Sequence, residues 1–243
     1  MSTPTSEQPT VIEPTDPTDP GVGRRGFLRT AGVTAAVAAL GAGAAVAAAP
    51  AAEATGGGID QIRFRKDGKL KIVQFNDTQD DERIDRRTLE LMEKVLDAEK
   101  PDLVVLNGDN ITGGCDTETQ MRQALNNVTV PMEQRRIPWL ITFGNHDEDS
   151  TPQGGLDEAD MLRIYRSYRY NINEATARGV TGTGNMSLSI GSGLRHGRTA
   201  FALYLLDSGR YAPDTLAGQD FEGLPTWDWL RMNQVEWYTR TSR

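Results

Sequence analysis

The chain has 243 residues but only two histidines and one cysteine. A disulfide-stapled scaffold needs paired cysteines, so the single Cys115 excludes that class. A structural zinc site built from cysteine and histidine needs more such ligands than the chain offers. Any metal site must therefore rely on aspartate, asparagine or glutamate, with at most two imidazoles, those of His146 and His196.

The chain also lacks an excess of positive charge. Its formal net charge is −8 at pH 7. Nucleic acid and anionic lipid both require a basic surface, so we expect neither as a partner. Small anionic substrates are compatible with this charge, because bound metal cations reverse the local electrostatic field. The hydrophobic content of 37% is typical of a globular protein with a core.

The first 55 residues lack the pattern of a folded domain. Residues 1–22 are rich in Pro, Thr, Asp and Glu, and such a segment buries too little apolar surface to fold. The letters RRGFL at residues 24–28 precede an Ala/Gly/Val stretch at 31–52, as in a twin-arginine export signal. We predict a cleaved signal that engages the twin-arginine export machinery, and a secreted, periplasmic or cell-surface protein. The alternative is an uncleaved anchor, but alanine and glycine insert weakly, so we expect no stable membrane partner.

The remaining residues, 56–243, have the pattern of a single domain in which strands and helices alternate. Apolar runs without polar interruption indicate buried strands, and apolar residues at helical spacing indicate the helices between them. This order predicts an α/β fold with a layered βαβαβ sheet, largely parallel at its start, and helices packed on it. The expected strands are 70–75, 103–106, 139–143, 186–190 and 200–206, and the expected helices are 85–98, 117–134, 157–167 and 233–242.

Each of the first three expected strands ends in a small polar cluster, namely Asn76–Gln79, Asn107–Asn110 and Gly144–Asp147. The carboxyl ends of parallel strands meet at one edge of a sheet, where α/β proteins bind ligands. We therefore expect two carboxylates, an amide and an imidazole to converge there. The alternative is that Asp and Asn merely form turns after strands, which is common for one cluster and much less so for three in succession.

Two of these motifs, Gly108-Asp109-Asn110 and the Gly144–Asp147 cluster, resemble those of the calcineurin-like metallophosphoesterases. The letters LYLLDSG at 203–209 and QVEW at 234–237 further resemble a purple-acid-phosphatase-related bacterial branch of that superfamily. The resemblance covers roughly residues 68–243. It implies the N-terminal portion of an α/β/β/α sandwich.

The resemblance also implies a dinuclear centre of divalent metal ions (Mn, Fe, Zn, Mg or Ca) that activates water to hydrolyse a small phosphorylated substrate. By the family's motifs, Asp77 binds the first metal, Asp109 bridges both and Asn145 binds the second. His146 matches the histidine that acts on the leaving group without binding metal. Asn110 is a further candidate, for substrate binding.

The sequence departs from the family pattern in three places. Gln79 stands where the family's first motif has histidine, and its amide oxygen is a weaker, harder ligand that favours Mg, Mn or Ca. Thr112 stands where purple acid phosphatases carry a tyrosine, so a purple iron–tyrosinate centre is not expected. The later metal-binding histidines have no counterpart, since only His196 follows His146, and we expect His196 in a hairpin loop.

Two hypotheses follow from the sequence. The first is metal-dependent hydrolysis of phosphate esters. The second is a catalytically inactive truncated fragment, or a weak metal- or phosphate-binding domain, because the simplest account of the missing motifs is the N-terminal portion of a longer protein. Three smaller expectations accompany them: Asp147 orients His146 or caps a turn, Cys115 is a neutral thiol, and Asp207–Gly209 forms a turn after a strand.

Overall fold

The computed structural model describes residues 61–195, 197–216, 218–220, 222–223 and 227–242. The predicted export signal and His196 lie outside these residues. No helix in the described part of the chain is long and apolar enough to cross a membrane. The elements in chain order are β1 (Ile72–Phe75), α1 (Arg86–Glu99), β2 (Leu103–Asn107), α2 (Glu118–Arg135), β3 (Trp139–Thr142), α3 (Thr151–Gly154), α4 (Glu158–Tyr165), β4 (Met186–Gly191), β5 (Thr199–Leu205), β6 (Thr215–Leu216), β7 (Gln219–Asp220) and α5 (Met232–Thr241).

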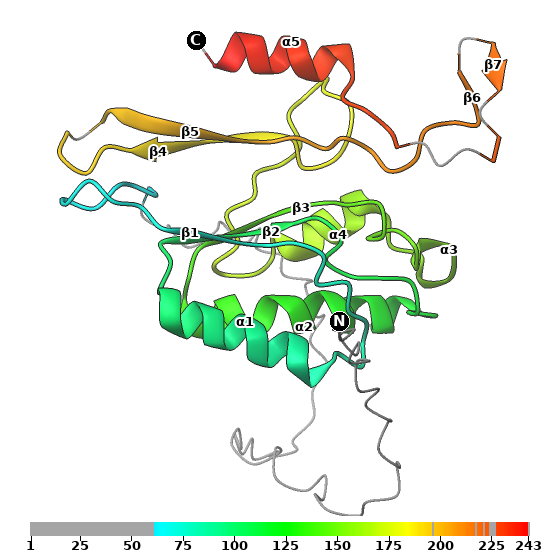
Figure 1. Cartoon of the computed structure of the whole chain (residues 1–243), viewed down its shortest axis with the longest axis horizontal. Helices are drawn as coiled ribbons and strands as arrows, with labels where there is room; N and C mark the ends of the chain where they lie inside the picture. The colour runs from blue at the N-terminus through cyan, green and yellow to red at the C-terminus, as the bar shows by residue number, and fades with distance from the viewer. Residues whose placement is uncertain (1–60, 196, 217, 221, 224–226, 243) are drawn as a thin grey trace, which may run out of the picture. The chain divides into compact units, whose positions relative to one another are not determined.

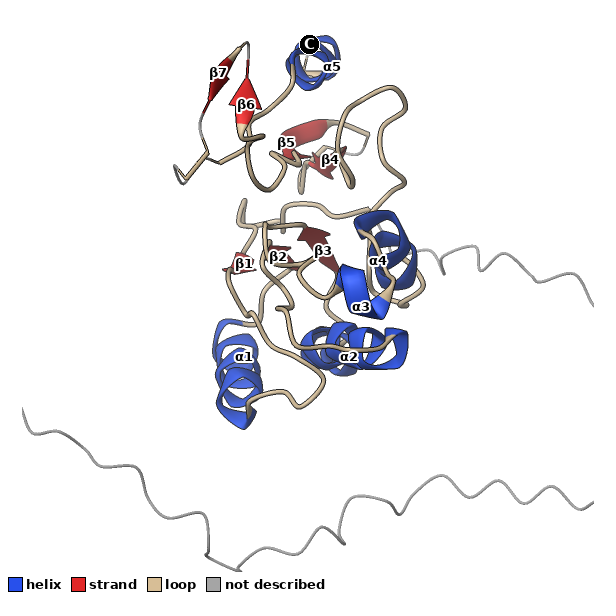
Figure 2. Cartoon of the chain, turned by 90° about the vertical axis from the view of Figure 1, so that its right-hand side faces the viewer, coloured by secondary structure: helices blue, strands red, loops and turns tan. Residues whose placement is uncertain are grey.

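The first layer is a parallel three-stranded sheet in the order β1-β2-β3. Val104 of the central strand pairs with Val73 on one side and with Trp139 on the other. Helices α1 and α2 cover one face of this sheet, as Figures 1 and 2 show. Right-handed crossovers through these helices return the chain to the same edge of the sheet after each strand. The carboxyl ends of all three strands therefore lie together.

Capping residues define where these helices begin and end. The side chain of Asp85 accepts a hydrogen bond from the backbone N–H of Arg87 at the start of α1, and Thr117 does the same for Gln120 at the start of α2. Such side chains satisfy N–H groups that the helix itself leaves unpaired. The helices end at residues in the left-handed backbone conformation, Lys100 for α1 and Arg136 for α2.

The main hydrophobic core lies between the sheet and its helices. Its members are apolar side chains whose positions match the periodicity of each element: one face of each helix and the helix-facing side of each strand. Trp139 and Tyr165 are the largest fully buried side chains, and their rings meet edge to face with centroids 5.8 Å apart. This packing joins β3 to α4.

The second layer is the antiparallel hairpin of β4 and β5, with α5 packed on its outer side. Tyr204 of β5 contacts the rings of Trp237 and Tyr238 of α5, with centroids 5.8 and 4.8 Å away. A smaller core, formed by Leu103, Leu140, Met186 and Leu205, joins this hairpin to the parallel sheet. The layers therefore follow one another in the order α1 and α2, the parallel sheet, the β4–β5 hairpin and α5.

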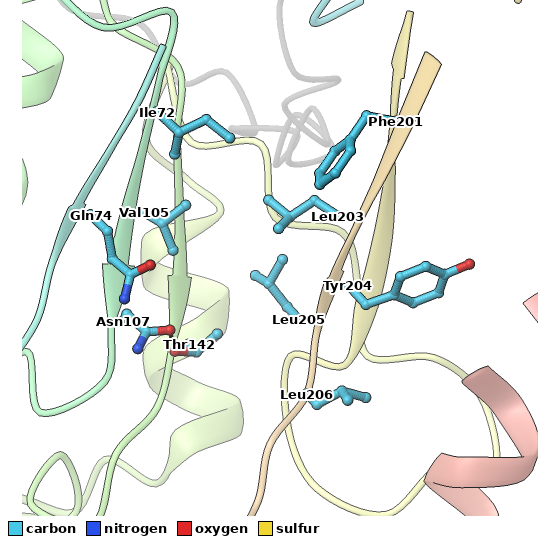
Figure 3. Close-up of a pocket in the computed structure, with 10 residues that line it drawn as sticks. All are labelled: Ile72, Gln74, Val105, Asn107, Thr142, Phe201, Leu203, Tyr204, Leu205 and Leu206. Atoms are coloured by element: carbon cyan, nitrogen blue, oxygen red, sulfur yellow. Dashed lines mark hydrogen bonds between the residues drawn. The ribbon is translucent and has the colours of Figure 1, made fainter. Parts of the chain in front are cut away.

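A cleft of about 550 Å³ lies between the parallel sheet and β5. Figure 3 shows Ile72 and Val105 on one wall, facing Phe201, Leu203 and Leu205 on the other. The predicted site residues do not line it. It is therefore a space between layers with a mixed apolar and polar lining, and not the predicted crevice at the strand ends.

The predicted α/β fold class is confirmed, and the five expected strands and four expected helices all form, with bounds that shift by a few residues. The short elements α3, β6 and β7 were not predicted from the sequence. Each has four residues or fewer, too few for a periodic pattern to stand out. The expected turn between β4 and β5 is confirmed on both sides of His196, where the N–H of Ser192 donates to the carbonyl of Arg198.

Candidate functional site

The segments after β1 and β2 run side by side beyond the end of the regular sheet. The backbone N–H of Asp77 donates to the carbonyl of Gly108 at 3.3 Å, and that of Gln79 donates to the carbonyl of Asp109 at 2.9 Å. The expectation that the first two polar clusters meet at one edge is therefore confirmed for their backbones. Asp77 and Gln79 are exposed there, whereas Asp109 is only 8% exposed.

Asp109 is held against the segment that follows β3. Its Oδ1 atom accepts a hydrogen bond of 2.9 Å from the backbone N–H of His146. A Cβ atom built on Gly144 would lie 2.2 Å from the same Oδ1 atom, so any side chain at that position would displace the carboxylate. Gly108 has φ +81°, which glycine adopts without cost. The two glycines of the sequence motifs are required for different reasons, one by space and the other by backbone conformation.

Backbone strain is concentrated at the predicted ligands. Among the described non-glycine residues with positive φ, Lys100 and Arg136 end helices, where this conformation is ordinary. The others are Asp77 (φ 52°), Gln79 (φ 39°) and Asp109 (φ 49°), which follow strands and end no helix. Left-handed conformations cost about 1–3 kcal/mol for such residues and cluster at functional sites. The strain therefore supports a function for these strand ends.

Asp147 joins the two loops that carry Asp109 and His146. It is fully buried, and its carboxylate accepts backbone N–H groups from Asn110 at 2.8 Å, Ile111 at 3.1 Å and Gly144 at 2.7 Å. Burial raises the pKa of Asp147 to about 6 although the three hydrogen bonds oppose that shift. Asp147 therefore joins two loops through backbone hydrogen bonds, a role beyond the two expected for it, which were orienting His146 or capping a turn.

Asp149 is the residue that contacts the His146 ring. Nδ1 of His146 lies 2.6 Å from Oδ2 of Asp149, and this contact raises the pKa of the imidazole above its ordinary value. The backbone brings them together in a turn, in which the N–H of Asp149 donates to the carbonyl of His146 at 3.0 Å. Sequence reasoning missed Asp149, because several acidic residues follow His146 and only the turn selects among them.

A segment from the second layer also reaches the loop after β3. The guanidinium of Arg210 donates to the carbonyl oxygen of Asn145 at 2.7 Å and to the Asp149 carboxylate at 2.6 Å, and it pairs with Glu148 at 3.4 Å. The Asn145 side-chain amide donates to the hydroxyl of Tyr211 at 2.8 Å. Neither Arg210 nor Tyr211 was predicted as a site residue from the sequence. The only sequence signal nearby was the expected turn at 207–209, where Gly209 indeed has φ +76°.

The side chain of Asn110 is buried and hydrogen bonded within the protein. It is 1% exposed, and its amide nitrogen donates to the carbonyl of Thr142 at 2.8 Å. A substrate-binding role for Asn110 stays a prediction. Cys115 is also buried, and burial raises the pKa of its thiol, in line with the neutral thiol expected from the sequence.

The donor atoms at the strand ends suit a hard divalent cation. Asp77 and Asp109 offer carboxylate oxygens, and the Tyr211 contact uses the amide nitrogen of Asn145, which leaves its carbonyl oxygen as the donor. In the described part of the chain, no three His, Cys, Asp or Glu side chains are grouped closely enough to hold a metal ion. The residues present thus fit the oxygen-donor portion of a metal site, and imidazole ligands are not among them.

Comparison with known proteins identifies a family. The model of the family described as "Calcineurin-like phosphoesterase" matches residues 70–239, more than half of the chain. That range includes every predicted site residue. The family resemblance inferred from the three strand ends is therefore confirmed.

Curated relatives narrow the resemblance further. The chain is 30% identical over 207 residues to the Arabidopsis thaliana protein named "Probable inactive purple acid phosphatase 14", with 76% of this chain and 50% of that protein aligned. It is 29% identical over 202 residues to "Probable inactive purple acid phosphatase 29" of the same plant, with 75% and 50% aligned. It is 30% identical over 196 residues to "Phosphatase DCR2" of Saccharomyces cerevisiae, with 73% and 32% aligned. The chain thus spans half or less of the length of these relatives.

Proposed function

Because the chain belongs to the calcineurin-like phosphoesterase family, we propose that it hydrolyses phosphate esters with divalent metal ions held at the ends of β1, β2 and β3. The observation that carries this proposal is the strained backbone at Asp77, Gln79 and Asp109, which no helix end explains. Divalent ions held there would supply positive charge to the phosphate oxygens and would activate a water molecule for hydrolysis. The substrate is a small phosphorylated molecule.

In this proposal Asp77, Asp109 and Asn145 hold the metal, with Gln79 as an additional oxygen donor. The backbone N–H of His146 orients the Asp109 carboxylate by a hydrogen bond, and Gly144, which has no side chain, lets the carboxylate pack against the backbone. Tyr211 fixes the Asn145 amide so that its carbonyl oxygen faces away from the hydroxyl. Oxygen donors of this kind favour Mg, Mn or Ca over softer ions.

His146 supplies the proton for the leaving group. Its Nδ1 atom is engaged by Asp149, which leaves Nε2 as the nitrogen that transfers the proton. The raised pKa keeps the ring charged to a higher pH, and a charged imidazole offsets negative charge on a departing oxygen. Arg210 holds Asp149 in turn, so the orientation of His146 depends on both layers of the fold.

A second candidate function is metal or phosphate binding without turnover. Two observations favour it: Gln79 stands where the family has a histidine ligand, and two of the relatives are named probable inactive phosphatases. Under this reading the strand ends bind a cation and an anion, but His146 has no leaving group to protonate.

Export by the twin-arginine route remains part of either proposal and is tested by replacing Arg24 and Arg25 with lysine, which should retain the protein in the cytoplasm.

The decisive experiment measures metal content and p-nitrophenyl phosphate hydrolysis for the full chain and for Asp109→Asn. Loss of this proposed metal-holding carboxylate should lower bound Mn and reduce hydrolysis by about 100-fold or more. The matched control is Asp67→Asn, at an exposed turn away from the strand ends, which should change neither. Metal binding without hydrolysis would favour the second function, and hydrolysis unchanged by Asp109→Asn would contradict the first.

A further inference from the structure

Two aromatic rings stand half-exposed beside the candidate metal site. Tyr211 is 49% exposed and Trp227 is 64% exposed, and their rings stack with centroids 5.5 Å apart and planes inclined by 29°. The Tyr211 hydroxyl is hydrogen bonded to Asn145, a predicted metal ligand. Single exposed aromatic residues are common, but this stacked pair places flat apolar surface next to Asn145, a predicted metal ligand.

The Tyr211 side chain is held by two contacts, one at its hydroxyl and one over its ring. Its hydroxyl accepts the 2.8 Å hydrogen bond from the Asn145 amide, and the guanidinium of the preceding residue, Arg210, lies 5.6 Å from the ring centroid. Arg210 is itself bound to the loop after β3. A ring held in this way loses little conformational freedom when a ligand stacks on it, and such preorganisation favours binding.

The Trp227 segment is held against the Tyr211 segment. Tyr211 and Trp227 form an isolated antiparallel bridge, and the N–H of Asp228 lies 3.4 Å from the carbonyl of Arg210. A Cβ atom on Gly209 would lie 2.2 Å from a carboxylate oxygen of Asp228, so the two segments approach as closely as glycine permits. The stacked pair is therefore built into the backbone and is not a chance contact of two surface side chains.

The charges around the rings favour a neutral group over a second phosphate. Arg210 is occupied by the carboxylates of Glu148 and Asp149. Arg231 pairs with Asp228 and lies over the ring of Trp229, 4.3 Å from its centroid. These two arginines are thus engaged by carboxylates, so an additional anionic group would gain little from them.

We propose that Tyr211 and Trp227 form the leaving-group subsite, and that the preferred substrates are phosphate monoesters whose leaving group carries a planar aromatic ring. This inference rests on the proposed function, because the phosphate must bind at the strand ends for its leaving group to reach the rings. Stacking on one side chain is tolerant of the identity of the ring. The subsite therefore selects a class of substrate and not a single compound.

The experiment titrates the full chain in Mn²⁺ with phenylphosphonate and with methylphosphonate, by isothermal calorimetry. Neither ligand is hydrolysed at its carbon–phosphorus bond, so the comparison does not depend on turnover. Phenylphosphonate should bind about tenfold more tightly to the wild-type protein, and Trp227→Ala should reduce that ratio to near one. The matched control is Trp229→Ala, which removes an indole that lies under Arg231 instead of against Tyr211, and which should preserve the ratio.

Each result decides the inference. A wild-type ratio near one, with both phosphonates bound, overturns the aromatic subsite and leaves the proposed function standing. Binding of neither phosphonate overturns both together. A tenfold ratio that Trp227→Ala leaves intact places the aromatic contact elsewhere and overturns the assignment to this residue pair. A wild-type ratio near one overturns the inference by itself, so the inference can be refuted even if the variant fails to fold.

Discussion

The parallel-sheet layer and the hairpin layer of this protein are built differently. Strand β2 is buried at four successive positions, whereas β5 is exposed at its first four. The first layer carries the predicted ligands on strand ends held by a large core, and the second contributes Arg210 and Tyr211 from a loop. The predicted ligand positions thus lie on the layer with the larger core, and Arg210 and Tyr211 contact them from the other layer.

The largest expected effect is at Asp147, which joins two loops of the parallel-sheet layer. Asp147→Ala leaves three buried backbone N–H groups without their acceptor, at about 1–3 kcal/mol each, so the free energy of unfolding should fall by about 3 kcal/mol or more in urea titrations. Asp149→Ala is the matched control two residues away, where the carboxylate is partly exposed, and it should lower stability by about 1 kcal/mol. Equal losses for the two variants would show that Asp147 does not hold the loops together.

The cores of the two layers should also differ in their sensitivity to truncation. Leu106→Ala removes a fully buried side chain from β2 and should lower the free energy of unfolding by about 2–5 kcal/mol. Phe201→Ala removes a half-exposed ring from β5 and should lower it by less than about 1 kcal/mol. Urea denaturation of both variants measures the contrast, and a larger loss at Phe201 would break the comparison.

Asp149→Asn tests the link between the layers at His146. Because the Asp149 contact raises the pKa of His146, that contact stabilises the fold below the ordinary imidazole pKa, and the stabilisation is lost as the pH rises through the raised value. The variant should lower the pKa of His146, measured by NMR titration of the two histidines in the chain. It should also reduce kcat about tenfold for phenyl phosphate and less for p-nitrophenyl phosphate, whose leaving group needs no proton. An unchanged pKa would contradict this role.

The last prediction concerns the pH dependence of stability at Glu158, at the start of α4. Burial and the carboxylates of Asp207 and Glu148 raise its pKa to about 8. A raised carboxyl pKa contributes stability at pH values below its ordinary value, and this contribution is lost as the pH rises through 8. In urea denaturation at two pH values, Glu158→Gln should therefore match the wild-type stability near pH 5 and exceed it at pH 9. Glu174→Gln, at an exposed position, is the control, and a gain of the same size there would refute the effect.

Much of the parallel layer was predictable because its signals are local. The uninterrupted apolar run at 103–106 and the periodic apolar residues of α1 each reflect burial that the element imposes on its own sequence. The position of Asp77, Asp109 and Asn145 near one edge then follows from the short right-handed connections between parallel strands. The hairpin β4–β5 and helix α5 were also predicted, but not how they meet the site.

The contacts of the candidate site were less predictable, because they join residues far apart in the chain. Arg210 reaches Asn145 and Asp149 across more than 60 positions, and no local pattern distinguishes it from other arginines. The carboxylate that binds His146 is Asp149 and not the adjacent Asp147, because the turn after His146 decides which side chain faces the ring. The left-handed backbone at Asp77 and Gln79 is similarly a property of the fold.

The sequence by itself determined the fold class, the family and the residues at the three strand ends, because burial periodicity and short motifs are encoded over a few consecutive residues. Tertiary structure alone decided the strain at the predicted ligands, the burial of Asp147, the Asp149 contact with His146 and the stacked pair of Tyr211 and Trp227. These features depend on how the two layers pack. Hydrogen bonds and close contacts between distant segments form only when the whole domain folds.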